Sequence, residues 1–451
     1  MTALCWEPTG LRDTPTPHPS SGSAGSQERT PRVAAPTRCN AGHGAAGLST
    51  GGSGNCPEIP DGSRSYALRA EAPYPPDLPG RGNTRLTDPR PGQCPGRREK
   101  MHTIGERLKQ ARLAAGMSQR RLAELAAPLT AMAISNYEND RFTPGSEVLL
   151  RLAKALNVRF EYFFRPVSVV LSPPQYRKHS RLGAKARTSL ESRIADAVER
   201  YLTVEGVFGE GRFKPPALKP VHVESFAEVE KAAERLRGAW SLGQDPIDDL
   251  CEVLEDRGVK VLLLDGADEK FDGFSCWANE TVPVVATGTG KPGDLQRFTL
   301  AHELGHLALD LEDAEDPERL AHRFAGAFLV PREAALREFG TRRSHLSIPE
   351  LHSLKHKWGL SMQAWLHRLH DLEVISDSTY RRAMMRFRQE GWRTKEPGKQ
   401  VDEVRTDRLV RLVEQALAED LVSPSRASEL LGQPLHAARA AWPQGLEVGV
   451  I

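Results

Sequence analysis

Residues 297–331 of the chain read RFTLAHELGHLALDLEDAEDPERLAHRFAGAFLVP, and they contain the motif HELGH at positions 302–306. Two histidines four positions apart lie on one face of a helix, where their imidazole nitrogens can hold one Zn²⁺. Glu303 follows the first histidine and can reach a water molecule at the metal as a general base. The stretch therefore predicts a zinc hydrolase site in which His302 and His306 bind the metal and Glu303 is catalytic.

A catalytic zinc ion needs a third protein ligand, and the predicted helix Glu318–Leu329 offers one. Glu318 and His322 lie four positions apart and share one face of this helix. We expect Glu318 to bind the metal. His322 is expected to act in catalysis, either by orienting a ligand or by contacting the substrate oxyanion.

Other residues near the motif are alternatives for the third ligand. Glu312 has the spacing found in another group of zinc peptidases, but the glycine expected in that arrangement is Leu309 here. Asp316, Glu315 and direct metal binding by His322 stay open.

A small sheet is predicted beside the motif helix. Val259–Leu264 is a continuous apolar run, typical of a buried strand. Val282–Thr287 reads as a second strand, and Pro283 suits an edge position because proline cannot donate a ladder hydrogen bond. An edge beside the motif helix could hold an extended peptide substrate through main-chain pairing. Asp294 is expected to cap the motif helix.

The stretches RFTLAHELGHLAL and PERLAHRFAGAFLVP resemble the ImmA/IrrE family of metallo-endopeptidases. The similarity extends over about residues 236–400 and includes GVKVLLLD, FSCWAN and VPVVAT. The resemblance implies a gluzincin-like domain with Zn²⁺ as cofactor, in which a glutamate on the helix after HExxH completes the site. It also implies a regulatory protease that cleaves a repressor carrying a helix-turn-helix domain.

Short amphipathic helices are predicted between residues 101 and 165. Leu108 and Ala111 lie on one apolar stripe, and Ser118 and Thr130 are suitable N-caps for the helices that follow them. The segments IGERLKQARLAAGMSQRRLAEL and TAMAISNYENDRFTPGSEVLLRLAKALNV resemble the five-helix, XRE-type helix-turn-helix domain of Cro and phage repressors. The resemblance covers essentially all of residues 103–165.

In that family the helix that begins near Thr130 enters the major groove of DNA. Carried over by position, the residues expected to face DNA are Gln119, Thr130, Ala131, Met132, Ser135, Asn136 and, for a phosphate group, Arg141. Ala131 and Met132 offer no hydrogen bonds for direct readout of bases, and Pro128 stands where glycine is common. A protein-interaction module with a solvated basic face is the alternative.

The net charge of +2 combines two oppositely charged regions. Residues 101–165 carry ten Lys/Arg against six Asp/Glu, a balance of +4 that suits contact with phosphate groups. Residues 241–333 carry eight against twenty, a balance of −12. No run of eighteen apolar residues occurs, which argues against a membrane span, and we expect a cytoplasmic protein.

Residues 1–100 hold 15 of the 33 prolines and 14 of the 38 glycines and have no helical or alternating periodicity. Such a segment cannot bury enough apolar surface to offset its chain entropy, so we expect it to be disordered. Amphipathic helix begins abruptly at Met101, which leads to the hypothesis that Met101 is the biological start.

The predicted chain is a multidomain α+β protein. The expected segments are 1–100 (disordered), 101–165 (all-α helix-turn-helix), 166–235 (helical connector, with a helix at Ser189–Val207), 236–345 (zinc metallopeptidase with a small sheet) and 346–451 (helical C-terminal region). An amphipathic helix pair in 408–431 is suited to packing or to self-association as a homodimer. A second histidine pair, His352 and His356, has the same four-residue spacing but no glutamate after its first member, so no second metal site is expected.

Two functions follow from these patterns. In the first, the chain is a DNA-binding regulatory zinc endopeptidase that cleaves a partner, expected to be a repressor or a neighbouring-gene product of toxin–antitoxin or phage type. In the second, it is a non-proteolytic regulator or antitoxin whose degenerate peptidase domain only binds a partner.

Overall fold

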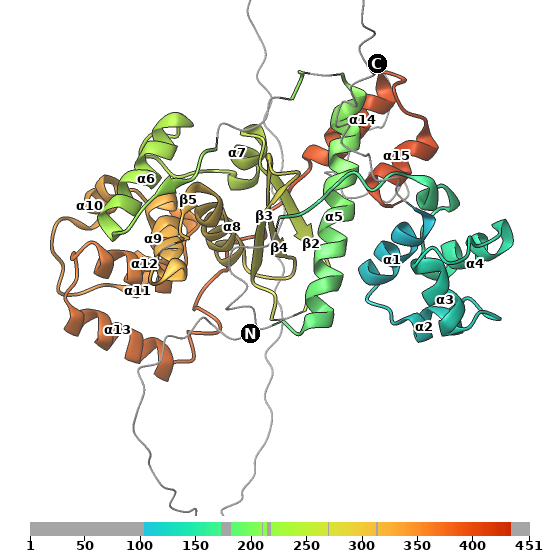
Figure 1. Ribbon diagram of the computed structural model, residues 1–451. Coiled ribbons are helices and arrows are strands. Elements are labelled where there is room, and N and C mark those ends of the chain that lie inside the picture. Colours follow the sequence, from blue (N-terminus) through green and yellow to red (C-terminus); the bar gives the residue numbers. More distant parts are fainter. Residues whose placement is uncertain are drawn as a thin grey trace, which may run out of the picture. The chain divides into compact units, whose positions relative to one another are not determined.

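Figure 1 shows the computed structural model of the chain, which describes residues 103–172, 182–209, 211–213, 218–268, 270–312 and 314–433. The segment 1–100 that was expected to be disordered, and the hypothesis of a start at Met101, lie outside these residues. Within the described ranges, no helix combines the length and the apolar character needed to cross a membrane.

The first described region is all-helical, as predicted. Its elements are α1 (Ile104–Ala114), α2 (Gln119–Leu125), α3 (Ala131–Glu138), α4 (Ser146–Leu156) and the 3-10 helix η1 (Phe160–Phe164). The side chains of Thr103, Ser118 and Thr130 each accept a hydrogen bond from the backbone N–H three residues on, which satisfies a donor at the helix start. Leu108 and Ile134 are fully buried in the core that these segments share.

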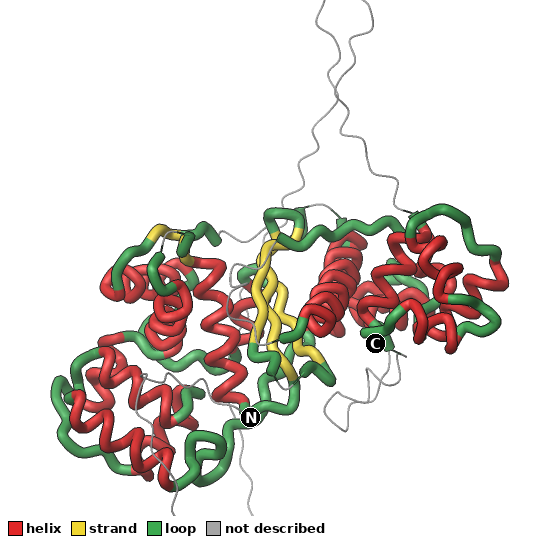
Figure 2. The backbone as a smooth tube through the Cα atoms, turned by 60° about the horizontal axis from the view of Figure 1, so that its bottom comes forward, coloured by secondary structure: helices red, strands yellow, loops and turns green. Residues whose placement is uncertain are grey.

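A three-stranded sheet lies beside the long helix α5 (Ala184–Val207), which contains the predicted helix of the connector. Its strands are β2 (Lys260–Leu264), β3 (Gly273–Ala278) and β4 (Val282–Gly288), in the spatial order β2-β4-β3. Because side chains alternate between the faces of a sheet, Val284 and Ala286 pack toward α5, and Val285 packs toward α8 (Gly293–Ala308). Helices therefore cover both faces (Figure 2).

The expectation that Pro283 lies on an edge strand is wrong. β4 is the central strand, antiparallel to β3 from Val282 to Thr287 and parallel to β2. Pairing with β2 begins only at Val284, opposite Lys260, so the missing N–H of Pro283 removes no hydrogen bond to β2. The edge strand nearest the motif helix is β3 instead.

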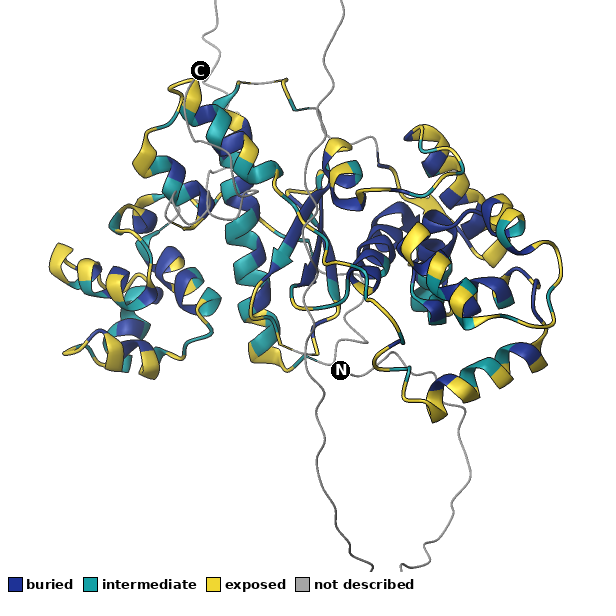
Figure 3. Cartoon of the chain, turned by 180° about the vertical axis from the view of Figure 1, so that it is seen from behind, coloured by how far each residue is buried: buried dark blue, intermediate teal, exposed yellow. Residues whose placement is uncertain are grey.

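The motif helix α8 is buried in the largest apolar core of the described residues. It shares this core with α6 (Phe226–Ala239), α7 (Leu250–Asp256), α9 (Pro317–Leu329), α10 (Arg332–Phe339), α11 (Ile348–Trp358), α12 (Met362–Asp371) and α13 (Asp377–Gln389). Figure 3 shows buried residues gathered where these helices face one another. The short strand β5 (Leu309–Asp310) follows α8 directly and pairs in parallel with β1 (Val221–His222).

Asp294 does not cap α8, contrary to expectation. The N-cap is Pro292, and Asp294 lies in the first turn, where its carboxylate pairs with Lys355 Nζ at 3.1 Å. Both side chains are buried, so the carboxylate joins α8 to α11 and takes no part in the cap.

The last described helices, α14 (Arg408–Ala418) and α15 (Pro424–Leu431), pack against α5. The predicted boundary between 235 and 236 falls inside α6. The predicted boundary between 345 and 346 falls between α10 and α11, which share one core. These two boundaries stay predictions.

Candidate functional site

The motif helix α8 turns His302 and His306 in the same direction. Both residues are buried, and their Nε2 atoms lie 3.1 Å apart. The ring planes are nearly perpendicular, at 86°, with the centroids 4.8 Å apart. Two ring nitrogens that converge in this way need a proton or a cation near them, because each offers a lone pair in its unprotonated form.

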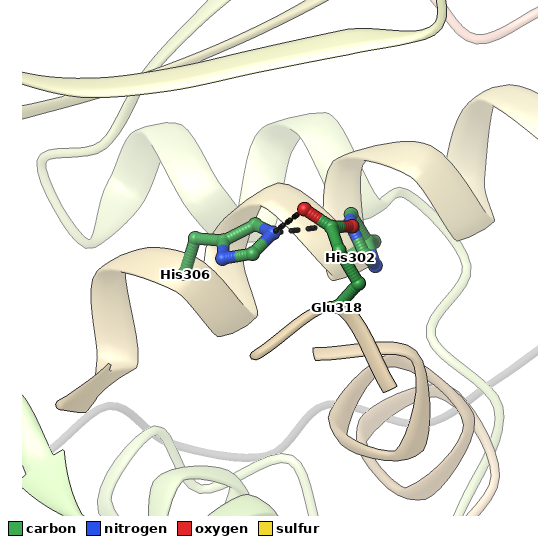
Figure 4. A group of neighbouring side chains, drawn as sticks. All are labelled: His302, His306 and Glu318. Carbon is green, nitrogen blue, oxygen red and sulfur yellow. Dashed lines mark hydrogen bonds and ion pairs between the residues drawn. The ribbon is translucent and has the colours of Figure 1, made fainter. Parts of the chain in front are cut away.

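Glu318 brings a third ligand atom to this point from α9 (Figure 4). Its Oε2 lies 3.2 Å from His302 Nε2, and its Oε1 lies 3.7 Å from His306 Nε2. Ligand atoms that are about 2.0–2.2 Å from one tetrahedral zinc ion lie about 3.3–3.6 Å from one another. The three side chains therefore have nearly the spacing that zinc needs, and they form the one such group within the described ranges.

The start of α9 explains why Glu318 reaches the histidines. Asp316 caps the helix by accepting the backbone N–H three residues on, and Pro317 occupies the first helical position. Glu318 therefore lies in the first turn. Gly305 allows α9 to approach α8 closely, since a Cβ atom at this position would lie 3.0 Å from the ring of Phe324.

The other candidates for the third ligand lie outside the group. Asp316 uses its carboxylate in the cap of α9, and Glu312 and Glu315 are exposed. His322 lies beside His302, with the ring centroids 4.5 Å apart, and is not among the converging ligand atoms.

Burial and the hydrogen bonds of Glu318 act in opposite directions on its pKa. Burial raises it, but the hydrogen bonds with His302 and His306 outweigh this effect and hold the pKa far below its ordinary value. The carboxylate is therefore ionised, as a metal ligand must be.

Glu303 is held between α8 and β3. Ser275 Oγ donates a hydrogen bond of 2.6 Å to Glu303 Oε2, and both residues are buried. Gly273 leaves room for the same carboxylate, because a Cβ atom there would lie 2.5 Å from Glu303 Oε1 and 2.6 Å from Thr299 Cγ2. Burial raises the pKa of Glu303, although the two motif histidines and Ser275 oppose this shift. Such a carboxylate is suited to exchanging a proton.

Sequence reasoning missed Ser275 and Gly273, since no motif spacing links them to Glu303. The one available signal was their alternation. Residues two apart in a strand share a face, and small residues there make space for a helix.

His322 lies one turn after Glu318 and packs between His302 and Phe298, with centroid distances of 4.5 and 5.7 Å. Its Nδ1 is buried and makes no hydrogen bond within the described part of the chain. Burial and the neighbouring His302 lower the pKa of His322 to about 3, so the imidazole is neutral at pH 7.

The candidate nucleic-acid interface is the outer face of α3 and its neighbours. The predicted residues there are all accessible: Thr130, Met132 and Arg141 are exposed, and Gln119, Ala131, Ser135 and Asn136 are half-buried. Met132 is 68% exposed and can offer an apolar contact, such as one to a thymine methyl group.

A buried ion pair beneath this face orients one of these residues. Glu138 Oε2 accepts hydrogen bonds from Arg112 Nη2 at 2.9 Å and from Gln119 Nε2 at 2.8 Å. Arg112 and Glu138 are buried, so the pair joins α1 to α3 and fixes the Gln119 amide at the start of α2. This contact was not predicted, because it joins helices far apart in the sequence.

Two family models match the chain. Residues 108–163 match a helix-turn-helix model, and residues 254–370 match the model of the IrrE N-terminal-like domain, a peptidase family. The predicted order of the two domains is confirmed. The second match includes Ser275, Glu303 and the three side chains of Figure 4. A search of curated proteins finds no match.

Proposed function

From a helix-turn-helix domain followed by an IrrE N-terminal-like domain, we propose that the chain is a DNA-binding regulator that cleaves a partner protein at a zinc site. One observation carries this proposal: His302, His306 and Glu318 converge beside the buried carboxylate of Glu303. Three protein ligands leave one position of a tetrahedral ion open, which is typical of catalytic zinc sites.

Two imidazoles and one carboxylate are a donor set that suits zinc, and their spacing supports the assignment of His302, His306 and Glu318 as ligands. A zinc ion held there supplies Lewis acidity, which polarises a peptide carbonyl and lowers the pKa of a water molecule toward about 7.

Glu303 is the general base in this proposal. It removes a proton from the attacking water and later delivers a proton to the leaving amine. The hydrogen bond from Ser275 Oγ to Oε2 holds this carboxylate in its orientation. The raised pKa of Glu303 favours both steps, because a group that must accept and then release a proton works best when its pKa is near the working pH.

His322 has one of two roles at this site. As a neutral imidazole it can donate a hydrogen bond to the oxyanion that forms on the substrate, or it can keep the ring of His302 in its orientation. Its packing against His302 is consistent with both.

The DNA-binding part of the proposal concerns double-stranded operator DNA. We place α3 in the major groove, with contacts from Gln119, Thr130, Ala131, Met132, Ser135 and Asn136, and with Arg141 at a phosphate group. The protein substrate is a repressor or a neighbouring-gene product. We place the chain and both partners in the cytoplasm. The apolar side chains of α14 and α15 are buried against α5, so a homodimer of this chain would need a different surface.

A second candidate is a non-proteolytic regulator or antitoxin, in which the IrrE-like domain only binds a partner. The charge balance of −12 over residues 241–333 favours it, because such a surface stays off DNA and attracts basic proteins.

Glu303→Gln distinguishes the two candidates. The zinc-loaded wild type and the variant are each incubated with the product of the neighbouring gene, and cleavage is followed by mass spectrometry. Under the first proposal only the wild type cuts, while both bind zinc and operator DNA. If regulation of the operator persists unchanged in the variant, the proteolytic function is wrong.

A further inference from the structure

The segment that follows the helix-turn-helix domain pairs with the last two residues of β3, on the outer edge of that strand. Leu171 forms an antiparallel bridge with Ala278, and the backbone N–H of Ser172 donates to the carbonyl of Trp277 at 2.8 Å. Residues 168–172, which we call the linker strand, therefore extend the sheet at this end of β3.

The side chains of the linker strand alternate as in a regular strand. Val169 is 5% exposed and Leu171 is half-buried, and both belong to the apolar cluster that includes Ile194 of α5. Val170, between them, is 70% exposed. The linker strand is thus anchored by every second side chain.

Asn279 binds the backbone of the linker strand in three ways. Its Oδ1 accepts from the Val170 N–H at 2.9 Å, its Nδ2 donates to the Ser168 carbonyl at 2.9 Å, and its N–H donates to the Val170 carbonyl at 2.8 Å. Asn279 has a φ of 49°, a conformation that asparagine adopts more readily than most residues. Its amide can therefore turn toward the linker strand.

The residues just before the linker strand are held by the helix-turn-helix domain. Arg107 of α1 donates from Nε to the Arg165 carbonyl at 2.7 Å and from Nη2 to the Pro166 carbonyl. The same guanidinium pairs with Glu199 of α5 and is fully buried. A change in the position of α1 therefore acts directly on the segment that enters the linker strand.

The edge that the linker strand covers leads to the candidate active site. Trp277 and Ser275 lie two residues apart on β3, and Ser275 holds Glu303. Extended peptides bind to proteins by adding a strand to a sheet edge, where main-chain hydrogen bonds supply affinity. A substrate that pairs with β3 past Ser275 needs the same backbone groups of Trp277 and Asn279 that the linker strand uses.

We propose that the linker strand is a built-in competitor of the peptide substrate on the edge of β3, so that it limits cleavage until it is displaced. The inference rests on the proposed peptidase function, because it names the surface that holds the substrate. It also gives the helix-turn-helix domain a physical connection to the active site through Arg107.

The test compares Val169→Ser with Val170→Ser in the full chain that also carries Glu303→Gln, so that binding is measured without cleavage. The probe is fluorescein-labelled β-casein, an unstructured protein, and binding is followed by fluorescence anisotropy. Val169→Ser removes a buried anchor and should tighten binding about tenfold, whereas the matched change at the exposed Val170 should leave it unchanged. Hydrogen exchange of the backbone amides of residues 170 and 172 should be faster in Val169→Ser and unchanged in the control Val170→Ser.

Equal binding by the two variants would overturn the proposal. If Val169→Ser does not fold, Leu171→Ser removes the second anchor and is judged by the same measurements. In the chain that keeps Glu303, Val169→Ser is expected to lower the KM for casein at unchanged kcat, because a competitor of the substrate is removed. If Val169→Ser binds casein more tightly but the protein that keeps Glu303 does not cleave casein, the competition by the linker strand is supported and only the peptidase function is rejected.

Discussion

The chain contains two histidine pairs with the same sequence spacing and almost the same ring separation, but with different surroundings. The ring centroids are 4.8 Å apart for His302 and His306 on α8, and 4.7 Å apart for His352 and His356 on α11. The first pair is buried and faces Glu318. In the second pair His352 is half-buried and His356 is exposed, and no carboxylate joins them within the described ranges.

The neighbouring segments explain this difference. At the first pair, Gly305 admits α9 and the cap of α9 presents Glu318. At the second, a Cβ atom on Gly398 would lie 2.3 Å from His352 Nε2, and His356 Nε2 lies 3.0 Å from the Lys399 carbonyl. A backbone segment thus covers the place where a ligand would have to enter. Helical spacing supplies two ligands, and the packing of a second element decides whether a metal site exists.

The largest expected effect is the loss of Glu303, the proposed base, which has no counterpart at the second pair. Glu303→Gln should lower kcat for labelled casein about 10²–10⁴-fold, because general-base catalysis contributes an acceleration of this size. Zinc content, measured by inductively coupled plasma mass spectrometry, should not change. Ser353→Gln, at the corresponding position of the second pair, is the control and should keep full activity. Retained activity in Glu303→Gln would contradict its assignment as the base.

The second prediction concerns zinc itself. Zinc at about a hundred times its Kd should stabilise the wild type by about 2.7 kcal/mol, since it binds the folded chain and has no preformed site in the unfolded one. His306→Ala should lose this stabilisation, and His356→Ala should keep it. Thermal unfolding with zinc and with EDTA measures both. If His356→Ala lost the zinc-dependent stabilisation, the assignment of the metal to His302 and His306 would be contradicted.

A smaller effect is expected from the strand that supports the first pair. Ser275→Ala removes the hydrogen bond to Glu303 Oε2 and should lower kcat about tenfold or more at unchanged KM, as is usual for residues that orient an active-site group. Steady-state kinetics measure the change, with Ser192→Ala on α5 as the control. A rise in KM at constant kcat would show that Ser275 acts on substrate binding instead.

The smallest effect on zinc binding and activity is expected when the HExxH spacing is completed at the second histidine pair, which lacks the neighbouring segments of the first. Ser353→Glu changes residues 352–356 from HSLKH to HELKH, which completes the motif spacing at the second pair. Because α9 is not available there and residues 398–399 cover the pair, zinc should stay at one equivalent per chain. In a His306→Ala background the change should not restore casein cleavage. A second zinc equivalent would show that spacing alone is sufficient.

The sequence allowed the local features of the fold to be predicted well. The caps Ser118 and Thr130 and the motif helix follow from residue chemistry and helical periodicity, and the structure has all three. Glu318 was favoured from its position in a helix, and the structure brings it to the two histidines. In each case the relevant residues lie within about one or two helical turns of one another or on consecutive helices.

The features that were missed depend on contacts between distant segments. Pro283 was expected on an edge because its own chemistry suits one, but the order of the strands places β4 in the centre. Ser275 contacts Glu303 across 28 residues, and Asn279 contacts Ser168 across 111. No periodicity in a single segment contains such pairings, since they arise only when the sheet and its neighbours pack.

The most direct test of the central claim is the zinc content of Glu318→Ala compared with Glu315→Ala. Both changes remove a glutamate near the start of α9, but only Glu318 lies with the two histidines. Native mass spectrometry of the zinc-loaded chains should find one zinc ion in the wild type and in Glu315→Ala, and none in Glu318→Ala. One tightly bound zinc ion in Glu318→Ala, or its loss in Glu315→Ala, would contradict the assembly of the site from α8 and α9.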